Sequence, residues 1–269
     1  MAQFTALTFD FANNSSINYD VYIVSYGGAS GWNTESAESN IQIVSDSIPR
    51  RTGNFVYGTR QNDVQQFSIT IGSDNKKSRA EIDRIKSWLI NMTPQNLIIN
   101  QPDMDFYRYT GFFTNPQLVS SGNRQFGMTF TFVSTSPFAH TFPKEKTLNI
   151  TAPTNYVFNN DSGNMDYLRP IIEITPTNIT QNFSITNNSD NGRVFQFNFV
   201  SPFPNGSEII TVDNQNQIIT SSLGNDFSRR RFTQFNMNFL RFIRGANHLR
   251  ITGNGNLKIR YVFARRIGS

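Results

Sequence analysis

Short segments that alternate apolar and polar residues follow one another along the chain. Residues 125–134 give the clearest case, because Phe126, Met128, Phe130 and Phe132 share one face while smaller or polar residues fill the other. A period of two is typical of a strand with one buried face. The same reasoning predicts a first β domain with further strands at residues 4–11, 19–26, 64–71, 97–99 and 106–113.

One segment of the first half has a helical period instead. Ser78 and Glu81 have the spacing of a capping box, in which the hydroxyl and the carboxylate accept hydrogen bonds from free amides at a helix start. Ile82, Ile85 and Leu89 then recur at three- to four-residue intervals, which places them on one helix face. We predict a single amphipathic helix over residues 78–89 that packs on the sheet.

Residues 41–60 fit neither a helix nor a central strand. The segment alternates only weakly, and it contains Pro49 and Gly53. Proline lacks the amide donor that a strand inside a sheet needs. The pattern therefore favours an extended arm or a long hairpin.

The chain changes character after residue 136, where a proline ends the strand and a charged stretch follows. We place a boundary between about 138 and 150, with domains at 1–140 and 151–269 joined by a linker at 141–150. The second domain has no helical period. Its short strands predict a β-sandwich of jelly-roll type, at residues 170–174, 183–185, 195–199, 208–212, 218–220, 235–243, 248–252 and 257–263.

The amino-acid composition agrees with an all-β protein. Phenylalanine occurs 25 times and asparagine makes up about one residue in eight, so strand-forming and turn-forming residues dominate. Charged residues make up only 16% of the chain, against about 25% in typical soluble proteins. The absence of cysteine excludes disulfides, thiol catalysis and sulfur-ligated zinc, and the two histidines, His140 and His248, are far apart in sequence.

The sequence contains none of the common catalytic motifs. A nucleophile elbow, a phosphate-binding loop, a dinucleotide-binding glycine pattern and a zinc-protease motif are all missing. We expect Asp103 and Asp105 to be solvated turn residues, and residues 161–166 lack the full ligand series of a calcium loop. These observations predict a binding or assembly protein with no catalytic residues, no cofactor and no metal.

The net charge of +5 hides an uneven distribution. Residues 220–269 contain ten basic residues and one acid, Asp226, which gives this segment a charge of +9 and leaves −4 for the remainder. A polyanion partner is one interpretation of such a block. Because the basic residues are spread over several predicted strands, we favour the other interpretation, a solvated or subunit-facing strand surface.

A membrane span or a secretion signal is not expected. No apolar run approaches the roughly 18 residues that a membrane span needs. Residues 1–13 lack the basic start and the apolar core of a signal peptide. We expect a protein that is made in the cytoplasm, is not secreted and has no membrane partner.

Several short patterns occur in a distinctive order along the chain. The first half contains Phe9-Asp10-Phe11, residues 19–24, the turn Ile48-Pro49-Arg50-Arg51-Thr52-Gly53, the helix at 78–89 and the strand end at 136–139. The second half contains residues 205–208, 210–214 and 245–249. In this order the patterns resemble the distal tail protein family of long-tailed bacteriophages, over essentially the whole chain.

The resemblance implies a mainly β fold and a structural role in the virion tail tip. The N-terminal domain would be a β-sandwich or split barrel with one amphipathic helix and an extended arm, and the C-terminal domain a galectin-like β-sandwich. Family members form a hexameric ring that joins the last tail-tube ring to the tail-tip hub protein, a tail-associated lysin or fibre hub. The ring leaves a central channel for DNA. In some members the outer domain docks receptor-binding or baseplate proteins.

The resemblance also assigns residues to interfaces. Ile48, Pro49, Arg50, Arg51 and Gly53 would lie in the arm that clasps the next subunit of a homo-hexamer. This turn departs from the family, because many relatives have a tighter glycine-containing turn here. The ring sheet would include residues 125–134. The candidates for contact with an outer partner are arginines of the basic segment, namely Arg229, Arg230, Arg231, Arg265 and Arg266.

Two other functions stay open on sequence grounds. A galectin-like sandwich could serve as a carbohydrate-binding module for host cell-wall glycan, but we find no recognisable lectin site, and fold alone does not imply function. The basic segment could instead bind nucleic acid, with affinity that falls steeply with salt. In a ring, DNA would only pass through a channel lined by residues 1–140, whose ten basic and eleven acidic residues nearly cancel.

Overall fold

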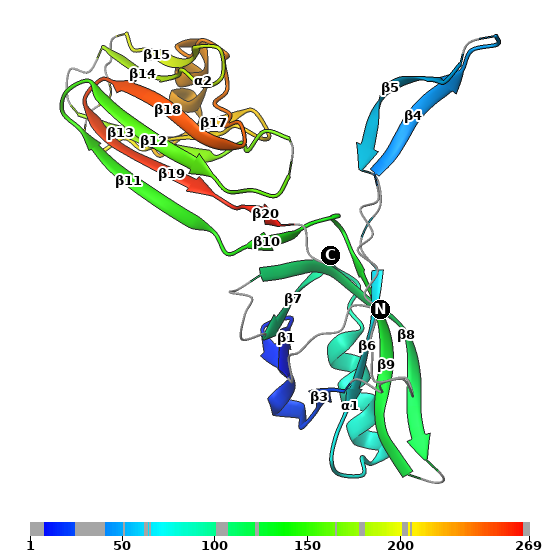
Figure 1. Cartoon of the computed structure of the whole chain (residues 1–269). Coiled ribbons are helices and arrows are strands. Elements are labelled where there is room, and N and C mark those ends of the chain that lie inside the picture. Colours follow the sequence, from blue (N-terminus) through cyan, green and yellow to red (C-terminus); the bar gives the residue numbers. More distant parts are fainter. Residues whose placement is uncertain are drawn as a thin grey trace. The chain divides into compact units, whose positions relative to one another are not determined.

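The computed structural model divides the chain into two compact units. One contains Met1–His140 and Arg265–Ser269, and the other contains Thr141–Ala264. Strands dominate both units (Figure 1), which confirms the mainly β fold. The structure describes residues 8–24, 41–50, 52–61, 64, 66–100, 107–121, 124–164, 166–177, 181–200, 204 and 206–265.

A nine-stranded sheet forms the centre of the first unit, and its main path has the order β2-β1-β7-β8-β9-β6-β3. The two short strands β10 and β20 lie off this path and pair with each other. The bounds are β1 (Thr8–Phe11), β2 (Asn14–Ser15), β3 (Tyr22–Ile23), β6 (Gln66–Gly72), β7 (Gln95–Asn100), β8 (Tyr107–Ser121), β9 (Arg124–Ser134), β10 (Ala139–Thr141) and β20 (Ala264–Arg265). A short 3-10 helix at Ser16–Tyr19 lies between β2 and β3.

The strand β9 lies between β8 and β6 and supplies much of the core. Met128, Phe130 and Phe132 are buried, as the alternation of this segment predicts. Phe132 stands opposite Phe113 of β8 and Phe67 of β6. The rings of Phe113 and Phe132 meet edge to face with centroids 5.2 Å apart, which is a favoured aromatic geometry.

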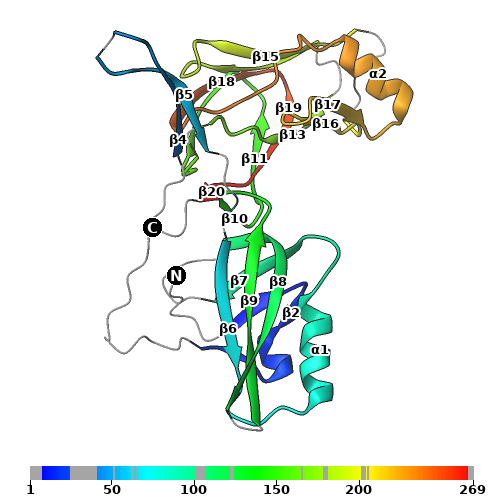
Figure 2. The ribbon, with the colours of Figure 1, turned by 90° about the vertical axis from the view of Figure 1, so that its right-hand side faces the viewer.

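Helix α1 (Arg79–Leu89) confirms the predicted helix and its capping box. The Ser78 hydroxyl accepts a hydrogen bond from the Glu81 amide, and the Glu81 carboxylate accepts one from the Ser78 amide at 2.7 Å. The Trp88 indole donates to the Phe11 carbonyl at 2.9 Å. This bond and the buried apolar face hold α1 along the sheet of the first unit (Figure 2).

Strands β4 (Ile41–Ser47) and β5 (Asn54–Gln61) form a separate two-stranded sheet. The hairpin predicted for this region is therefore present (Figure 1). At its tip Arg50 has φ 68° and Gly53 has φ 91°. Glycine adopts such left-handed angles readily, whereas arginine adopts them only against a steric preference.

The second unit is a β-sandwich with one core, as predicted. Its five-stranded sheet has the order β11-β19-β13-β16-β17, and its four-stranded sheet the order β12-β18-β14-β15. Ile172 and Ile259 come from the first of these sheets and Phe195 and Ile251 from the second, and all four are fully buried. The bounds are β11 (Lys144–Ile150), β12 (Thr154–Asn160), β13 (Ile171–Pro176), β14 (Asn182–Asn187), β15 (Arg193–Asn198), β16 (Ile210–Asp213), β17 (Ile218–Ser221), β18 (Gly245–Thr252) and β19 (Gly255–Tyr261).

The structure corrects three predictions for this unit. Residues 141–150 are not a linker, because β11 pairs along its whole length with β19. Residues 235–243 are not a strand, since only isolated bridges form at Phe235 and Phe242. The second unit also contains helix α2 (Asn225–Thr233), although no helical period was found in this half of the sequence, and its only buried residue is Arg231.

The close pairing of β9 with β6 leads to a prediction about Gly127. A Cβ atom at this position would collide with the Ile71 carbonyl oxygen and lie 2.8 Å from the Gly72 Cα. These are backbone atoms that cannot turn aside, so Gly127→Ala should destabilise the first unit by about 1–3 kcal/mol. Trp88 is buried in the first unit and the second unit contains no tryptophan, so tryptophan fluorescence during urea unfolding measures this change.

Gly58 of β5 provides the matched control. A Cβ atom there would meet nothing within 4 Å, and its φ angle is not in the left-handed region. Gly58→Ala should leave the unfolding midpoint close to that of the unsubstituted chain. Equal midpoints for both variants would contradict the tight packing at Gly127.

Candidate interaction surfaces

The β4–β5 hairpin exposes large apolar side chains. Val56 is 55% exposed and Tyr57 is 62% exposed, and Ile43 and Phe55 are exposed as well. A two-stranded hairpin by itself is marginally stable in water at best. Grouped exposed apolar residues mark interaction sites in soluble proteins. We call Ile43, Phe55, Val56 and Tyr57 the hairpin surface.

The predicted arm residues lie at the tip of this hairpin. Ile48, Pro49, Arg50 and Gly53 follow β4 or precede β5, and all four are exposed. Arg51 lies outside the described residues. Their role at a subunit interface stays a prediction. The predicted interface residues do not include the hairpin surface, although three consecutive large apolar residues in a weakly alternating segment are visible in the sequence.

Much of the basic C-terminal segment is neutralised inside the second unit. Arg241 Nε lies 2.8 Å from Asp190 Oδ2, and Arg260 pairs with Glu173. Lys258 Nζ lies 3.8 Å from the same glutamate. These acids come from earlier in the chain, so part of the positive charge of the C-terminal segment is compensated within the folded unit.

Arg231 is fully buried and cannot contact an outer partner, so this candidate is wrong. Its Nη2 donates to Glu208 Oε2 at 2.6 Å and its Nε to Glu208 Oε1 at 2.9 Å, which makes a two-pronged ion pair. A third hydrogen bond runs from Nη1 to Gln234 Oε1 at 2.7 Å. The guanidinium carbon also lies 5.3 Å from the centroid of the Phe199 ring. Because all these partners lie within the unit, Arg231 serves its folding.

The other arginine candidates differ in their surroundings. Arg229 and Arg230 are exposed on α2, and neither has an acidic partner among the described residues. Arg230 lies over the Phe227 ring at 5.6 Å. Arg265 is half-buried and lies 6.0 Å from the centroid of the Tyr107 ring, and Arg266 lies outside the described residues. Arg229 and Arg230 are thus the candidates whose charge is most available.

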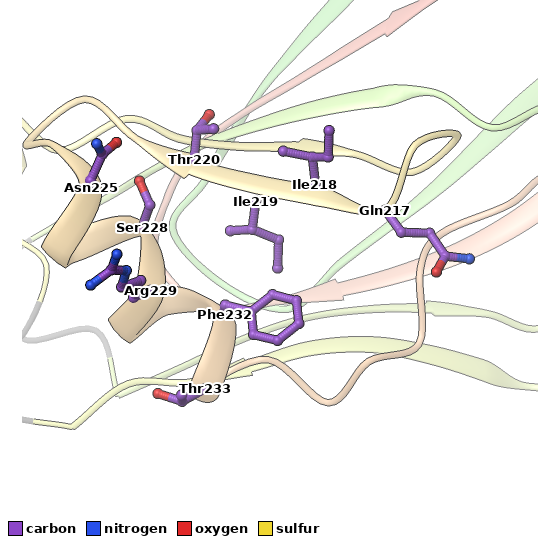
Figure 3. Close-up of a pocket in the computed structure, with 9 residues that line it drawn as sticks. All are labelled: Gln217, Ile218, Ile219, Thr220, Asn225, Ser228, Arg229, Phe232 and Thr233. Carbon is purple, nitrogen blue, oxygen red and sulfur yellow. The ribbon is translucent and has the colours of Figure 1, made fainter.

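An open groove of about 640 Å³ runs between β17 and α2. Figure 3 shows Ile219 directed from β17 towards the helix, with Phe232 beside it, whereas Ile218 and Thr220 point to the other side of the strand. Arg229 and Ser228 also line the groove from the helix. Its size lies within the usual range of ligand-binding clefts.

Among the described residues, those considered for catalysis or metal binding form no cluster. Burial lowers the pKa of His140, and the positive charge of Arg108 adds to this effect. His248 lies on β18, far from His140 in the chain, and Asp103 and Asp105 lie outside the described residues. Within the described ranges, no group of three or more His, Cys, Asp or Glu residues could hold a metal ion. In the same ranges, no helix is long and apolar enough to cross a membrane.

Comparison with known proteins identifies the class of the chain. A family model described as the phage tail protein N-terminal domain matches residues 4–136, and one described as the phage tail C-terminal domain matches residues 138–261. The structure of the Dit protein of phage SPP1 is similar with a TM-score of 0.69 and 12% identity, over 96% of this chain and 100% of that one. A chain of the phage P2 baseplate, solved in its activated conformation with calcium, has a TM-score of 0.50 and 8% identity, over 97% and 99%. Among curated proteins, no sequence matches.

The two β units thus define a phage tail protein with the fold of the distal tail proteins. The chain belongs to the phage tail protein family whose N-terminal and C-terminal domains match residues 4–136 and 138–261. This result confirms the resemblance to the distal tail proteins that the sequence patterns indicated. It places the protein in the virion tail.

The buried ion pair yields a stability prediction. Arg231→Leu leaves the Glu208 carboxylate buried without its partner, which should destabilise the second unit by about 3–5 kcal/mol. The double variant Arg231→Leu, Glu208→Leu removes both charges and should recover part of this loss. Arg230→Leu, on the exposed side of the same helix, should change stability by less than about 0.5 kcal/mol.

Calorimetry of the full chain measures these differences, and tryptophan fluorescence separates the two units. Trp88 is buried in the first unit and the second unit contains no tryptophan, so the fluorescence transition should stay in place while the calorimetric transition of the second unit moves. Equal effects of Arg231→Leu and Arg230→Leu would show that the buried pair is not what holds α2.

Proposed function

We propose that the protein is a structural adaptor of the tail tip, in which six copies form a ring between the tail tube and the tail-tip hub. The exposed hairpin surface is the observation that carries this proposal. A ring closes through one heterologous contact repeated around an axis, so each subunit must offer a projecting element and a complementary surface. The β4–β5 hairpin, a separate two-stranded sheet with exposed apolar side chains, would supply the projecting element.

The relatives support the same role. The SPP1 protein is described as a paradigm of the hub adsorption apparatus of phages that infect Gram-positive hosts, and the P2 chain belongs to a baseplate. Such a position brings the protein into contact with other tail and baseplate proteins. By analogy we assign this chain a place in the tail-tip hub, with a tail-tube ring on one side and a hub protein on the other.

The charge distribution suits a ring that lets DNA pass. Residues 1–140 carry ten basic and eleven acidic residues, so a channel lined by them would have little net attraction for phosphate. The nucleic-acid-binding alternative has less support, because Arg231, Arg241, Lys258 and Arg260 pair with acids of the same unit. No arrangement of the described residues specifically favours the glycan-binding alternative.

The ring makes a direct prediction about mass. Light scattering coupled to size-exclusion chromatography should give a particle of about six copies, and negative-stain images should show an open ring. Tyr57→Asp puts a charge into the apolar contact and should reduce the particle to smaller species. A monodisperse monomer of the unsubstituted chain at micromolar concentration would overturn the proposal.

Met92→Asp is the matched control for Tyr57→Asp. Met92 is 99% exposed in the segment after α1, so the same change in charge occurs at an apolar side chain outside the hairpin. This variant should keep the mass of the unsubstituted chain. Tryptophan fluorescence of both variants should confirm that the first unit is folded.

A further inference from the structure

The outer edge of β17 is open for hydrogen bonding. β17 ends the five-stranded sheet, and within the described ranges it pairs with β16 alone. The Ser222 amide donates to the Ile209 carbonyl. Because hydrogen-bonded residues alternate along an antiparallel pair, the N–H and C=O groups of residues 222, 220 and 218 face β16. Ser221 faces the other way, and its amide donates to the Ser228 hydroxyl of α2 at 2.8 Å.

This alternation fixes the orientation of the Ile219 backbone. Ile219 lies two residues from Ser221, so its N–H and C=O are directed away from β16, towards the groove. Neither group has a hydrogen-bond partner within the part of the chain that the structure describes. An edge that presents a donor and an acceptor in this way is a template for an added strand.

The side chains that line the groove restrict the chemistry of a ligand. The Ile219 and Phe232 side chains give the groove an apolar wall (Figure 3). The adjacent Arg229 is exposed and has no acidic partner in the described ranges. Asp213, at the end of β16, accepts hydrogen bonds from the backbone and side-chain amides of Asn216. The groove therefore favours a ligand with an apolar side chain and a carboxylate.

We propose that the β17–α2 groove binds a short, extended, acidic peptide segment of another tail protein as an added strand. The peptide backbone pairs with Ile219, an apolar side chain packs against Phe232, and a carboxylate faces Arg229. Recognition by strand addition obtains affinity from backbone hydrogen bonds and specificity from alternate side chains. The inference rests on the proposed function in one respect, namely that the second unit meets a neighbouring protein of the tail tip.

Fluorescence anisotropy with a defined peptide tests this proposal on the full chain. The probe is a capped, fluorescein-labelled hexapeptide of alternating glutamate and valine. It should bind saturably and increase the protection of the Ile219 amide in hydrogen exchange. A lysine–valine hexapeptide should bind at least about tenfold more weakly, and so should a glutamate–valine peptide with alternate amides methylated, because it cannot complete the ladder.

Two arginines on one helix supply the matched pair of variants. Arg229→Glu should weaken binding of the glutamate–valine peptide by about tenfold or more, whereas Arg230→Glu, whose side chain does not line the groove, should change it by less than about twofold. Phe232→Ala should also weaken binding, since it removes the apolar wall.

Several results would overturn the proposal. They are the absence of saturable binding, equal losses for Arg229→Glu and Arg230→Glu, and equal binding of the methylated peptide. Equal losses would indicate general attraction to a basic surface. A cell-wall glycan fragment that protects the Ile219 amide when the peptide does not would assign the groove to another ligand. The mass of the particle is measured on the same samples, so failure of peptide binding and failure of ring formation are distinguishable.

Discussion

The buried ion pair between Arg231 and Glu208 determines how the outer edge of the second unit is built. Two charges without solvent exposure are tolerated only when their hydrogen bonds are complete, and here the guanidinium reaches both carboxylate oxygens and Gln234. Because Arg231 is the only buried residue of α2, this pair rather than an apolar stripe holds the helix in place. The position of α2 in turn defines one side of the groove beside β17.

The same interaction separates two uses of arginine on one short helix. Arg231 is buried and its charge is paired with Glu208, whereas Arg229 and Arg230 are exposed. Elsewhere in the unit, Asp190 and Glu173 neutralise further basic residues of the C-terminal segment. Several basic residues of the C-terminal segment are thus paired within the unit, and only some of them remain available to a partner. A small number of available charges limits the desolvation that an interface must overcome while still favouring an acidic partner.

Periodicity predicted the elements whose burial is apolar and regular. It located α1 with its cap and β9 with its buried phenylalanines, because each has one continuous apolar face. It failed for β11, whose only buried side chain is Ile150, so the strand has the composition of a linker. It failed for α2 because a buried arginine carries no hydrophobic signal, and its partner Glu208 lies 23 residues away in the chain.

The candidate interaction surfaces were likewise predicted only in part. The sequence indicated a basic segment, but a count of charges cannot show which arginine has an internal partner. It indicated a hairpin, but Val56 and Tyr57 are exposed because no described element packs on the faces of β4 and β5. Both features depend on contacts between distant segments or on their absence, which local patterns do not encode.

The exposed strands of the two units differ in how far they depend on a partner for stability. At β17 of the second unit, the Ser228 hydroxyl accepts a hydrogen bond from the Ser221 amide, the Ile219 backbone stays open, and the core beside it is buried within the unit. In the hairpin, no described element covers the strands, so its own burial is too small to hold the strand pair firmly. Binding of a neighbouring subunit would stabilise the hairpin by mass action, while the sandwich folds without such help. In the proposed ring, subunit closure is thus coupled to ordering of the hairpin, and docking of an outer partner can vary without changing the ring.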